Sequence, residues 1–570
     1  MIPDVERNGF TFTDGVGTIS RELMQLVHDK VNYNNTQKLE FSAVQIRVNG
    51  CKGVLSMDPT LTGRRICIRP SMQKFTTDHY QLEIVTPARV NACHLNRQAI
   101  TLLSTLGVPD ESFQALHDKM LNELNGMVLD DKSALQVLSK TNMHMNDCLR
   151  IMINSGIHVQ SDPFLYNMLW VTRVKMLKDL RTKTRILVEN GAVLMGVSDE
   201  SRRLRNNQVY IKTSKHGVIS GQVVIVKNPC THPGDVRVVN AVTLDRLQCC
   251  MDDDGNELEN TFLEEIKDVI VFTQYGARPV PNEASGSDLD GDEYHVFWDP
   301  SIKPATVEPA SYIALEELHE PINFDTLTRF FVNFLLNDQL GRIANAWLCH
   351  ADASDQGAND DACLFLAQQH SNAVDYAKSG RPAYFPKRLK TKSVPDFTEN
   401  KHKDSYLSDK IIGKLFRQIT ENKDPDPITE FDVIHEFDLE GVENYLQEAK
   451  ELRDDYNFSL TSMMKIFGVK NEFEFVSGNV TTFGKDLSSH KEYDVRERII
   501  NAYSALRKEF LQKFEMGLDG ALEEEREKKA CAWYKVVYKG EYSKYEKKLY
   551  SFAWLRYGEL TNIKKRSRNL

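Results

Sequence analysis

The hydrophobic periodicity of this chain changes three times along its length, and these changes restrict the folds that it can adopt. Residues 8–95 and 185–298 alternate short apolar runs with glycine-containing turns, which is typical of β-strands. Residues 97–180 repeat apolar side chains at helical spacing, and this spacing returns after about residue 300. The pattern predicts two β units that are separated by helices and followed by a mostly helical region.

Each β unit is expected to contain several short strands. Asn49 and Gly50 lie between two apolar runs and are a strong signal for a hairpin turn. In the first unit we expect a strand and turn over 10–17, then strands at 43–48, 53–57, 65–68 and 81–85. In the second unit we expect strands at 185–188, 192–197, 209–211, 221–226 and 269–273. Both units are interpreted as compact barrels.

The predicted fold class is α+β, with several domains. A chain of 570 residues is long enough for two to four of them. Two Asp-Pro dipeptides at 424–427 mark an expected subdomain boundary within the helical region. We expect a first barrel over 1–96, a helical connector over 97–180, a second barrel over 181–300 and a mostly helical neck and head over 301–570.

A short acidic stretch near the middle of the chain carries a chemical signal. Asp288, Asp290 and Asp292, here called the aspartate triad, occupy alternate positions just before an expected strand at 293–298. Three like charges on one loop repel, so one of them is expected to take up a proton unless a divalent cation is bound. Oxygen ligands suit Mg²⁺, and Gly291 allows a sharp turn that lets the side chains converge.

Other interpretations of these carboxylates have to be compared with a metal site. An acidic surface turn is common, and residues 252–256 look like one in a solvated hairpin. A calcium loop of the EF-hand type is poorly supported, because its sixth position is Glu293 instead of glycine and its twelfth is Asp299 instead of glutamate. A haloacid dehalogenase phosphatase would need a buried apolar strand before the motif, and residues 281–286 cannot form one.

Composition limits the classes of partner. A net charge of −10 argues against a protein that coats nucleic acid nonspecifically, but it leaves room for a local basic channel. Basic clusters at 173–185, 202–205 and 564–568 are each expected to be solvated faces. No apolar run approaches the length of a membrane span, so we expect a soluble protein of the cytoplasm or nucleus with no membrane partner. The ten cysteines lack metal-ligand spacing and are expected to be reduced thiols.

Several further motifs occur in an order that carries a family resemblance. They lie at 12–17 (FTDGVG), 50–53 (GCKG), 69–75 (RPSMQKF), 95–98 (LNRQ), 194–197 (LMGV), 228–235 (NPCTHPGD), 285–292 (SGSDLDGD), 373–376 (AVDY) and 378–380 (KSG). In this set the chain resembles, over essentially its whole length, the eukaryotic cell-encoded RNA-dependent RNA polymerases of RNA silencing.

The resemblance implies a fold and a set of site residues. The implied catalytic core consists of two double-psi β-barrels joined by a helical connector and followed by a mostly helical head. The catalytic and metal-binding roles fall on the aspartate triad, with Mg²⁺ or Mn²⁺ as the cofactor. Nucleotide phosphates are expected to face Lys52 and Lys74 of the first barrel, and Arg69 is a third candidate.

The implied activity is that of an RNA-directed RNA polymerase in RNA interference and small-RNA amplification. In such nucleotidyl transfer a 3′-hydroxyl attacks the α-phosphate of a nucleotide, and two metal ions stabilise the attacking and leaving oxygens. The implied partners are a single-stranded RNA template, nucleoside triphosphates, a double-stranded RNA product and other silencing proteins.

One departure from the family pattern motivates an alternative. Members usually have a long region before the 12–17 motif, with a slab-like domain that helps to form the template channel, whereas this sequence begins almost on the motif. The alternative expectation is therefore a shortened, catalytically inactive relative that binds RNA or acts as a scaffold for silencing proteins.

Overall fold

The computed structural model divides the chain into two compact units, which are described separately. The first comprises Met1–His117 and Thr184–Gln418, and the second comprises Asp118–Lys183 and Ile419–Leu570. The structure describes residues 1–32, 39–141, 144–247, 250–251, 257–258, 261–312, 321–419, 431, 433–481, 489–518, 520, 522–540 and 548–568.

The N-terminal part of the first unit forms a sheet in which five strands pair among the described residues. Their order is β6-β3-β5-β4-β7, with β3 parallel to β5 and the other neighbours antiparallel. The strands are β3 (Val16–Ser20), β4 (Ala43–Val48), β5 (Cys51–Asp58), β6 (Ile66–Cys67) and β7 (Glu83–Pro87). Helix α1 (Arg21–Asn32) buries Met24 and Val27 against this sheet, and β1 (Glu6–Arg7) pairs with β2 (Phe10–Thr11).

The predicted hairpin turn at Asn49 and Gly50 is confirmed. The two residues have φ angles of 48° and 73°, and they connect the antiparallel strands β4 and β5. Two successive positive φ angles are what a type I′ turn requires, and its twist matches that of the strands it joins. The resulting register places Lys52 opposite Arg47.

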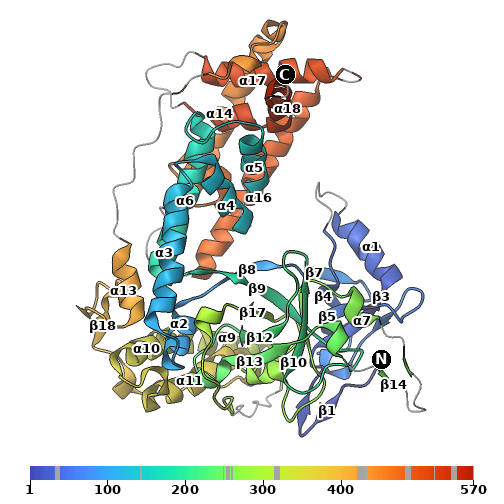
Figure 1. The fold of residues 1–570 in the computed structure, drawn as a ribbon, viewed down its shortest axis with the longest axis vertical. Coiled ribbons are helices and arrows are strands. Elements are labelled where there is room, and N and C mark those ends of the chain that lie inside the picture. The colour runs from blue at the N-terminus through green and yellow to red at the C-terminus, as the bar shows by residue number, and fades with distance from the viewer. Residues whose placement is uncertain are drawn as a thin grey trace. The chain divides into compact units, whose positions relative to one another are not determined.

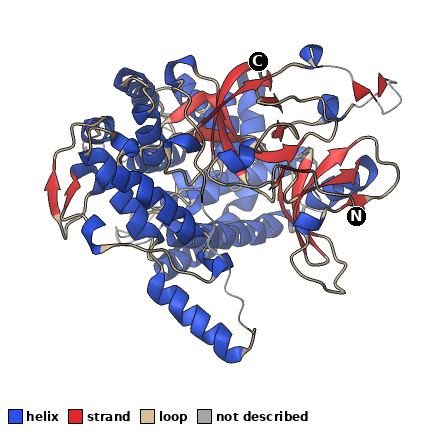
Figure 2. Cartoon of the chain, turned by 90° about the horizontal axis from the view of Figure 1, so that it is seen from below, coloured by secondary structure: helices blue, strands red, loops and turns tan. Residues whose placement is uncertain are grey.

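The second β unit is a closed barrel. In the described residues six strands pair in the order β10-β13-β12-β17-β9-β16, and β16 pairs again with β10 to complete the ring. They are β9 (Leu187–Ser198), β10 (Gln208–Thr213), β12 (Gly221–Val226), β13 (Arg237–Ala241), β16 (Val269–Phe272) and β17 (Glu293–Phe297). The short strands β8 (Asn91–His94) and β11 (Gly217–Val218) extend the sheet beside β9 and β10. Figure 2 shows the strands of the two β units as neighbouring groups.

The barrel interior explains why these segments are strands. Val197, Ile211, Val223 and Val296 come from four different strands and are all fully buried in one apolar core. Leu289 of the acidic loop joins the same core, with an exposed fraction of 1%. The loop that carries the aspartate triad is therefore anchored in the barrel.

Some strand boundaries differ from the prediction. The strands expected at 185–188 and 192–197 are one continuous strand, β9, because Gly191 continues the ladder to Phe297 of β17. Residues 16–17 were expected to belong to a turn, but they begin β3, whose polar Thr18 and Ser20 are buried inside the sheet. β8 and β13 were missed, because neither shows a clear alternation of apolar residues.

Helices account for most of the remaining chain of the first unit. The helical spacing expected after about residue 300 is interrupted at Asp338 and Gln339, which separate α9 from α10. The helices are α2 (Arg97–Thr105), α7 (Phe262–Glu265), α8 (Val280–Glu283), α9 (Phe324–Asn337), α10 (Leu340–Ala353), α11 (Asp361–Val374), α12 (Tyr376–Ser379) and α13 (Ile411–Gln418) (Figure 1). The parallel pair β18 (Ser393–Pro395) and β19 (Asp404–Tyr406) lies near α10.

The second unit is helical in its described residues. Its core contains many aromatic side chains, among them Trp533, Trp554 and Tyr456, which are almost completely buried. Its helices are α4 (Asp131–Lys140), α5 (Asn146–Asn154), α6 (Pro163–Lys183), α14 (Leu446–Phe467), α15 (Glu472–Ser477), α16 (Ser489–Glu515), α17 (Glu523–Tyr538) and α18 (Tyr557–Arg568), and α3 (Asp110–Gly126) also reaches into it. This agrees with a mostly helical head.

The remaining predictions concern small features. The acidic turn at 252–256 lies outside the described residues, although β14 (Cys250–Met251) and β15 (Glu257–Leu258) on either side of it pair antiparallel. The boundary motif at 424–427 also lies outside them. Every cysteine whose side chain the structure describes is a free thiol. Within the described part of the chain, no helix combines the length and the apolar character needed to cross a membrane.

Candidate functional site

The aspartate triad lies on the loop that enters β17, as the sequence predicted. One carboxylate oxygen from each of Asp288, Asp290 and Asp292 lies within 4.8 Å of the others, and all three residues are partly buried. Three convergent carboxylates form the oxygen-rich donor set that a hard divalent cation takes. The arrangement can therefore hold a metal ion.

The barrel holds this loop from one side. Leu289 is buried in the barrel core, and the Tyr294 hydroxyl donates a hydrogen bond of 2.7 Å to the carbonyl oxygen of Asp288. The Gly196 amide of β9 donates a bond of 3.2 Å to the carbonyl oxygen of Asp292. A Cβ atom at Gly196 would lie 2.5 Å from the Tyr294 ring, so only glycine lets the loop strand pack this closely on β9.

The first sheet holds the loop from the other side. The Leu289 amide donates to the carbonyl oxygen of Asp14 at 2.9 Å, and the Gln45 side-chain amide donates to the carbonyl oxygen of Asp290 at 3.0 Å. Gly15 has a φ of +81°, and a Cβ atom there would lie 2.5 Å from the Cβ of Asp290. The acidic loop therefore packs directly against the Asp14-Gly15 motif before β3.

The electrostatics of the triad reflect its crowding. Burial, followed by the charges of Asp290 and Asp292, raises the pKa of Asp288 to about 7. A carboxyl group with two carboxylate neighbours resists ionisation because a second and third negative charge are brought close to it. A divalent cation would remove this repulsion, so the donor set fits the metal that the sequence implied.

Two lysines already oppose this negative charge. Lys52 of β5 places its Nζ 2.7 Å from Oδ2 of Asp290. Lys227, directly after β12, places its Nζ 3.1 Å from Oδ2 of Asp292. The acidic loop is thus flanked by one cation from each β unit.

The triad opens into a pocket of about 510 Å³. Lys52 and Lys227 line it together with a segment, residues 370–379, that runs through the end of α11 and α12. This segment contributes Lys378, whose Nζ lies 3.3 Å from Oδ1 of Asp375. Burial disfavours the charged form of Lys378, but the charges of Asp375 and of the triad raise its pKa overall. The pocket lining therefore combines the aspartate triad and a fourth carboxylate, Asp375, with three lysines.

The predicted Lys74 lies next to this site. In the described structure it does not line the pocket, and its Nζ donates to the carbonyl oxygen of Ser71 at 2.9 Å. Burial raises the pKa of Asp14, and the positive charge of Lys74 counteracts that increase. Lys74 therefore acts on a fourth carboxylate, Asp14, at the edge of the triad.

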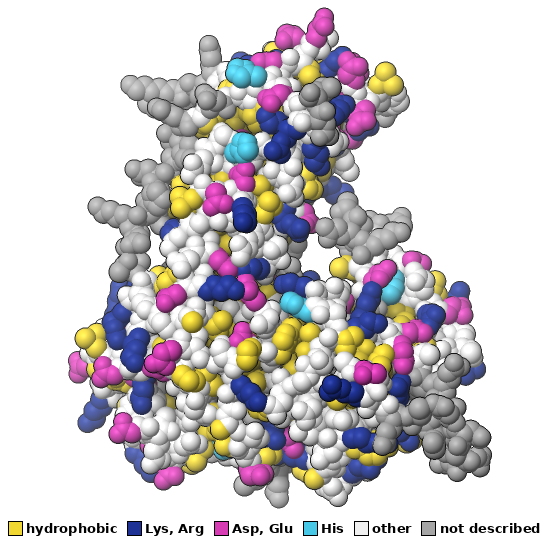
Figure 3. Space-filling model, in the orientation of Figure 1, with side chains coloured by type: hydrophobic (Ala, Val, Ile, Leu, Met, Phe, Trp, Pro, Cys, Tyr) yellow, Lys and Arg dark blue, Asp and Glu magenta, His cyan; other side chains and the backbone are white. Residues whose placement is uncertain are grey.

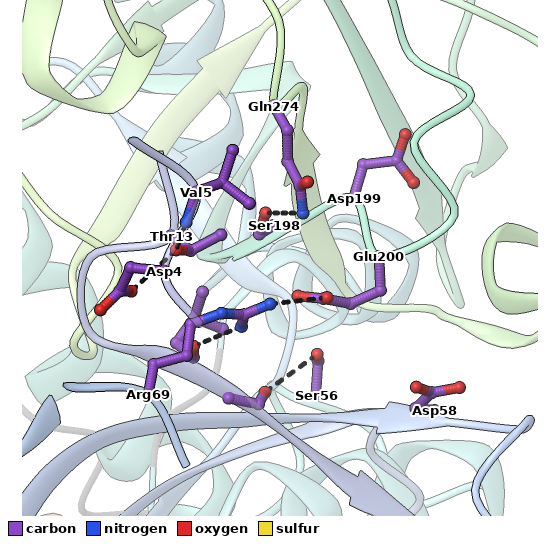
Figure 4. Close-up of polar contacts among 12 residues, drawn as sticks. Asp4, Val5, Thr13, Ser56, Asp58, Arg69, Ser198, Asp199, Glu200 and Gln274 are labelled. Carbon is purple, nitrogen blue, oxygen red and sulfur yellow. Dashed lines mark hydrogen bonds and ion pairs between the residues drawn. The ribbon is translucent and has the colours of Figure 1, made fainter. Parts of the chain in front are cut away.

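Arg69 lies in a different environment from the two lysines. Its side chain is only 4% exposed and forms an ion pair with Glu200 at 2.8 Å. Its Nη1 donates to the carbonyl oxygen of Val16 at 2.7 Å, and its Nε donates to that of Pro3 at 3.3 Å. Figure 4 shows the guanidinium directed at Glu200. This geometry is that of a group that ties β3 to the loop after β9.

The sequence reasoning missed several members of the site. Lys227 could have been found from strand pairing, because Val226 is in register with His295, three residues after Asp292. Lys378 lies in a motif that supported the family resemblance but had no assigned role. The sequence did not identify Gln45 as a site residue, because it is one polar residue in a strand of alternating apolar and polar residues.

Two protein-family models match this chain. The family described as "RNA dependent RNA polymerase" matches residues 1–419, and that described as "RdRP, head domain" matches residues 433–570. The chain belongs to the RNA-dependent RNA polymerase family. The match covers both β units and the triad, and the head-domain match falls on the helical C-terminal region.

Named relatives of this polymerase family are similar over the whole chain. A probable RNA-dependent RNA polymerase 1 of Oryza sativa subsp. japonica is 37% identical, with 97% of this chain and 75% of the relative aligned. RNA-dependent RNA polymerase 6 of Arabidopsis thaliana is 37% identical over 100% of this chain and 50% of the relative. RNA-dependent RNA polymerase 1 of Schizosaccharomyces pombe is 31% identical over 90% of this chain and 44% of the relative. The chain thus spans about half the length of several of these polymerases.

A solved polymerase shares the fold. The RNA-dependent RNA polymerase QDE-1 from Thielavia terrestris aligns with a TM-score of 0.55 at 18% identity, over 99% of this chain and 67% of that chain. Together with the closed barrel and the match to the head domain, this confirms the predicted α+β fold class of the double-psi barrel type, with a helical head. The first β unit, which was also predicted as a barrel, pairs as a five-stranded sheet whose described strands do not close into a ring.

Proposed function

We propose that this chain carries the catalytic centre of an RNA-directed RNA polymerase that copies single-stranded RNA. The observation that carries the proposal is the convergence of the aspartate triad and three lysines on one pocket, within a chain of the RNA-dependent RNA polymerase family. In this proposal the products serve RNA interference and small-RNA amplification, and the ligands are template RNA, nucleoside triphosphates and the double-stranded product.

The aspartate triad is proposed to hold the catalytic metal. Mg²⁺ suits its oxygen ligands, and Mn²⁺ is a suitable substitute. When bound, such ions stabilise the attacking 3′-oxygen and the leaving pyrophosphate oxygen. The chain's own contribution is to keep the three carboxylates close together. Two hydrogen bonds hold their loop: the Gln45 side-chain amide donates to the carbonyl oxygen of Asp290, and the Leu289 amide donates to that of Asp14.

The lysines of the pocket are proposed to bind the triphosphate. Lys52, Lys227 and Lys378 approach the triad from three different segments. Ammonium groups placed where negative charge develops on a leaving pyrophosphate lower the barrier to transfer. Lys74 is proposed to add positive charge near the triphosphate from its position beside Asp14. Arg69 is buried and ion-paired, so it is proposed to stabilise the fold.

The four-part organisation of the sequence is proposed to match these roles. In this proposal the first barrel segment, 1–96, supplies cations and contacts the acidic loop, and the second, 181–300, supplies the triad. The segment 97–180 connects these two, and the segment 301–570 contributes Lys378 and the head.

Nucleotide incorporation by the purified chain tests the proposal. The assay follows labelled nucleotide on a single-stranded RNA template with Mg²⁺ or Mn²⁺, for the wild type, Asp290→Ala and a matched surface variant, Asp355→Asn. Asp355 is exposed and distant in sequence from the triad. We expect template-dependent product from the wild type and from Asp355→Asn, and none from Asp290→Ala.

Two results would contradict the proposal. Folded wild-type protein that binds RNA but incorporates nothing would favour the shortened, non-polymerising relative. Product that persists in Asp290→Ala would place the catalytic metal elsewhere.

A further inference from the structure

A second pocket of the first unit has a different chemical character from the catalytic one. It has a volume of about 560 Å³ and lies between the start of α2, helix α10 and the segment 385–403. Its described lining contains four cationic side chains and no carboxylate, whereas the catalytic pocket of similar size is acidic at its centre. The four cations are Arg97, Arg342, Lys390 and Lys403.

These cations are not neutralised by acidic neighbours. None of the four forms an ion pair with any described residue. Lys403 donates to the backbone oxygen of Thr391 at 2.9 Å and to its hydroxyl at 3.2 Å. The guanidinium of Arg342 lies 5.7 Å from the centre of the Phe385 ring. Like charges gathered without counter-charges repel, and an anionic ligand would relieve that repulsion.

Arg97 is the most constrained of the four. Its Nη2 donates to the backbone oxygen of Phe397 at 2.7 Å, and its guanidinium stacks over the Phe397 ring with 5.0 Å to the centroid. Its Nε is buried and has no hydrogen-bond partner among the described residues. Burial lowers the pKa of Arg97 to about 10, and the nearby charge of Glu399 only partly offsets this effect. The charge of this partly buried guanidinium is therefore only partly compensated by its neighbours.

The other lining groups fit a nucleic-acid ligand. Asn345, Asn400 and Thr398 offer neutral hydrogen bonds, and Phe385 offers an aromatic surface. Arginine and lysine with amides and an aromatic ring are the combination that binds phosphates and stacks bases of single strands. A volume of about 560 Å³ is in the range of sites that take a ligand of nucleotide size.

A local site is needed because the surface as a whole is not basic. The net charge is −10, and on the face drawn in Figure 3 the Lys and Arg side chains are interspersed with Asp and Glu. Affinity for RNA must therefore come from particular clusters of cations. Arg97 also belongs to the 95–98 motif, for which the catalytic proposal provides no role.

We propose that this basic pocket binds a backbone phosphate of single-stranded RNA at a point separate from the catalytic pocket. The inference depends on the proposed function only in the choice of RNA as the ligand. A free nucleoside triphosphate carries the same phosphate chemistry, so the experiment has to separate the two sources.

The test measures binding without catalysis. A fluorescently labelled single-stranded RNA is titrated with the full chain in EDTA, by fluorescence anisotropy, at several salt concentrations. The test variant is Arg342→Gln/Lys390→Gln/Lys403→Gln, which leaves the buried Arg97 in place. The control is Lys387→Gln/Arg388→Gln/Lys392→Gln, which removes the same charge from exposed positions of the same segment that do not line the pocket.

We expect the test variant to bind RNA about tenfold to 100-fold more weakly at moderate salt. The salt slope is expected to be smaller by about 0.7, the change for one lost phosphate contact of a single strand. The control is expected to stay within about threefold of the wild type. Melting temperatures close to that of the wild type will show that both variants are folded.

Three outcomes would overturn the proposal. If RNA affinity falls equally in the test and control variants, the loss reflects the overall positive charge of the segment and not the pocket. If RNA affinity falls in neither variant, the pocket does not bind RNA. Unchanged RNA binding together with loss of ATP binding in the test variant would assign the pocket to free nucleotide. Because EDTA removes catalysis from the assay, none of these results depends on whether the chain incorporates nucleotides.

Discussion

Lys52 and Asp290 join the two β units at the acidic loop, with 2.7 Å between Nζ and Oδ2. The lysine comes from β5 of the first sheet, and the aspartate comes from the loop that enters β17 of the barrel. The Lys52 side chain is 42% exposed, whereas that of Asp290 is 16% exposed. The lysine is therefore exposed enough to meet the triphosphate that is proposed to bind in this pocket.

The first prediction concerns Lys52→Met. The variant is expected to fold, because the side chain is partly exposed, but to lose about 10²- to 10³-fold in kcat, the usual cost of removing one group that stabilises transition-state charge. Steady-state incorporation on a fixed template measures this loss. Lys387→Met, at an exposed position outside the pocket, is the control, and equal activity of the two variants would remove Lys52 from the proposed site.

The second prediction concerns Gly291→Ala. Gly291 has a φ of +128°, and an added Cβ would overlap the side-chain amide of Gln45. Backbone strain of this kind costs about 1–3 kcal/mol, so the variant is expected to be less stable and to lose most of its incorporation activity. Denaturant unfolding and incorporation are both measured.

A double variant separates steric overlap from backbone strain. Gly291→Ala/Gln45→Ala removes the overlapping amide but keeps the unfavourable φ, so it is expected to recover only part of the lost stability. Full recovery would mean that the backbone conformation at 291 is unimportant.

The third prediction separates a structural role of Arg69 from phosphate binding. Arg69→Met leaves Glu200 buried without its partner, which is expected to lower the free energy of unfolding by about 3–5 kcal/mol. Burial already raises the pKa of Glu200, and Arg69 is the main group that opposes this increase. Arg69→Met/Glu200→Gln is therefore expected to recover much of the stability. If that double variant is stable but its KM for nucleotides rises about tenfold or more, Arg69 contacts substrate after all.

The fourth prediction concerns acid stability of the barrel. Burial, and then the charge of Arg185, lowers the pKa of His295 to about 4 from an ordinary value of 6.5. Below pH 6.5 the unfolded chain takes up a proton there, whereas the folded chain does not until about pH 4. Above pH 6.5 His295 is neutral in both states, and its burial does not reduce the free energy of unfolding. As the pH falls from 6.5 to 4, the proton bound only by the unfolded chain lowers the free energy of unfolding, by at most about 3 kcal/mol.

His295→Gln provides the measurement for this effect. The free energy of unfolding is measured from pH 7 to pH 4 for the wild type, this variant and His402→Gln, which changes an exposed histidine. The slope with pH should be shallower only in His295→Gln, whatever its stability at neutral pH. An unchanged slope would show that His295 titrates alike in the folded and unfolded chain.

Strands and site residues could be predicted from the sequence where a few consecutive residues formed a clear pattern. The strand at 221–226 was predicted with the bounds that β12 has, because Val223 and Ile225 point inward while turn signals mark both ends. The triad was recognisable for the same reason, since three alternate carboxylates before a strand form one contiguous pattern. β13 was missed because its sequence, RVVNA, shows no clear alternation of apolar and polar residues.

The sequence by itself therefore determined the order of β and helical segments, the acidic loop and the family. The tertiary structure decided which side chains meet that loop. It brought Lys52 and Lys227 to two carboxylates, buried Arg69 against Glu200 and assembled four cations around a separate pocket. The physical reason is that strand and helix patterns reflect neighbours a few residues apart. Ion pairs and pockets depend instead on strand pairing and packing between segments far apart in the chain, as for Gln45 and Asp290, whose positions differ by 245.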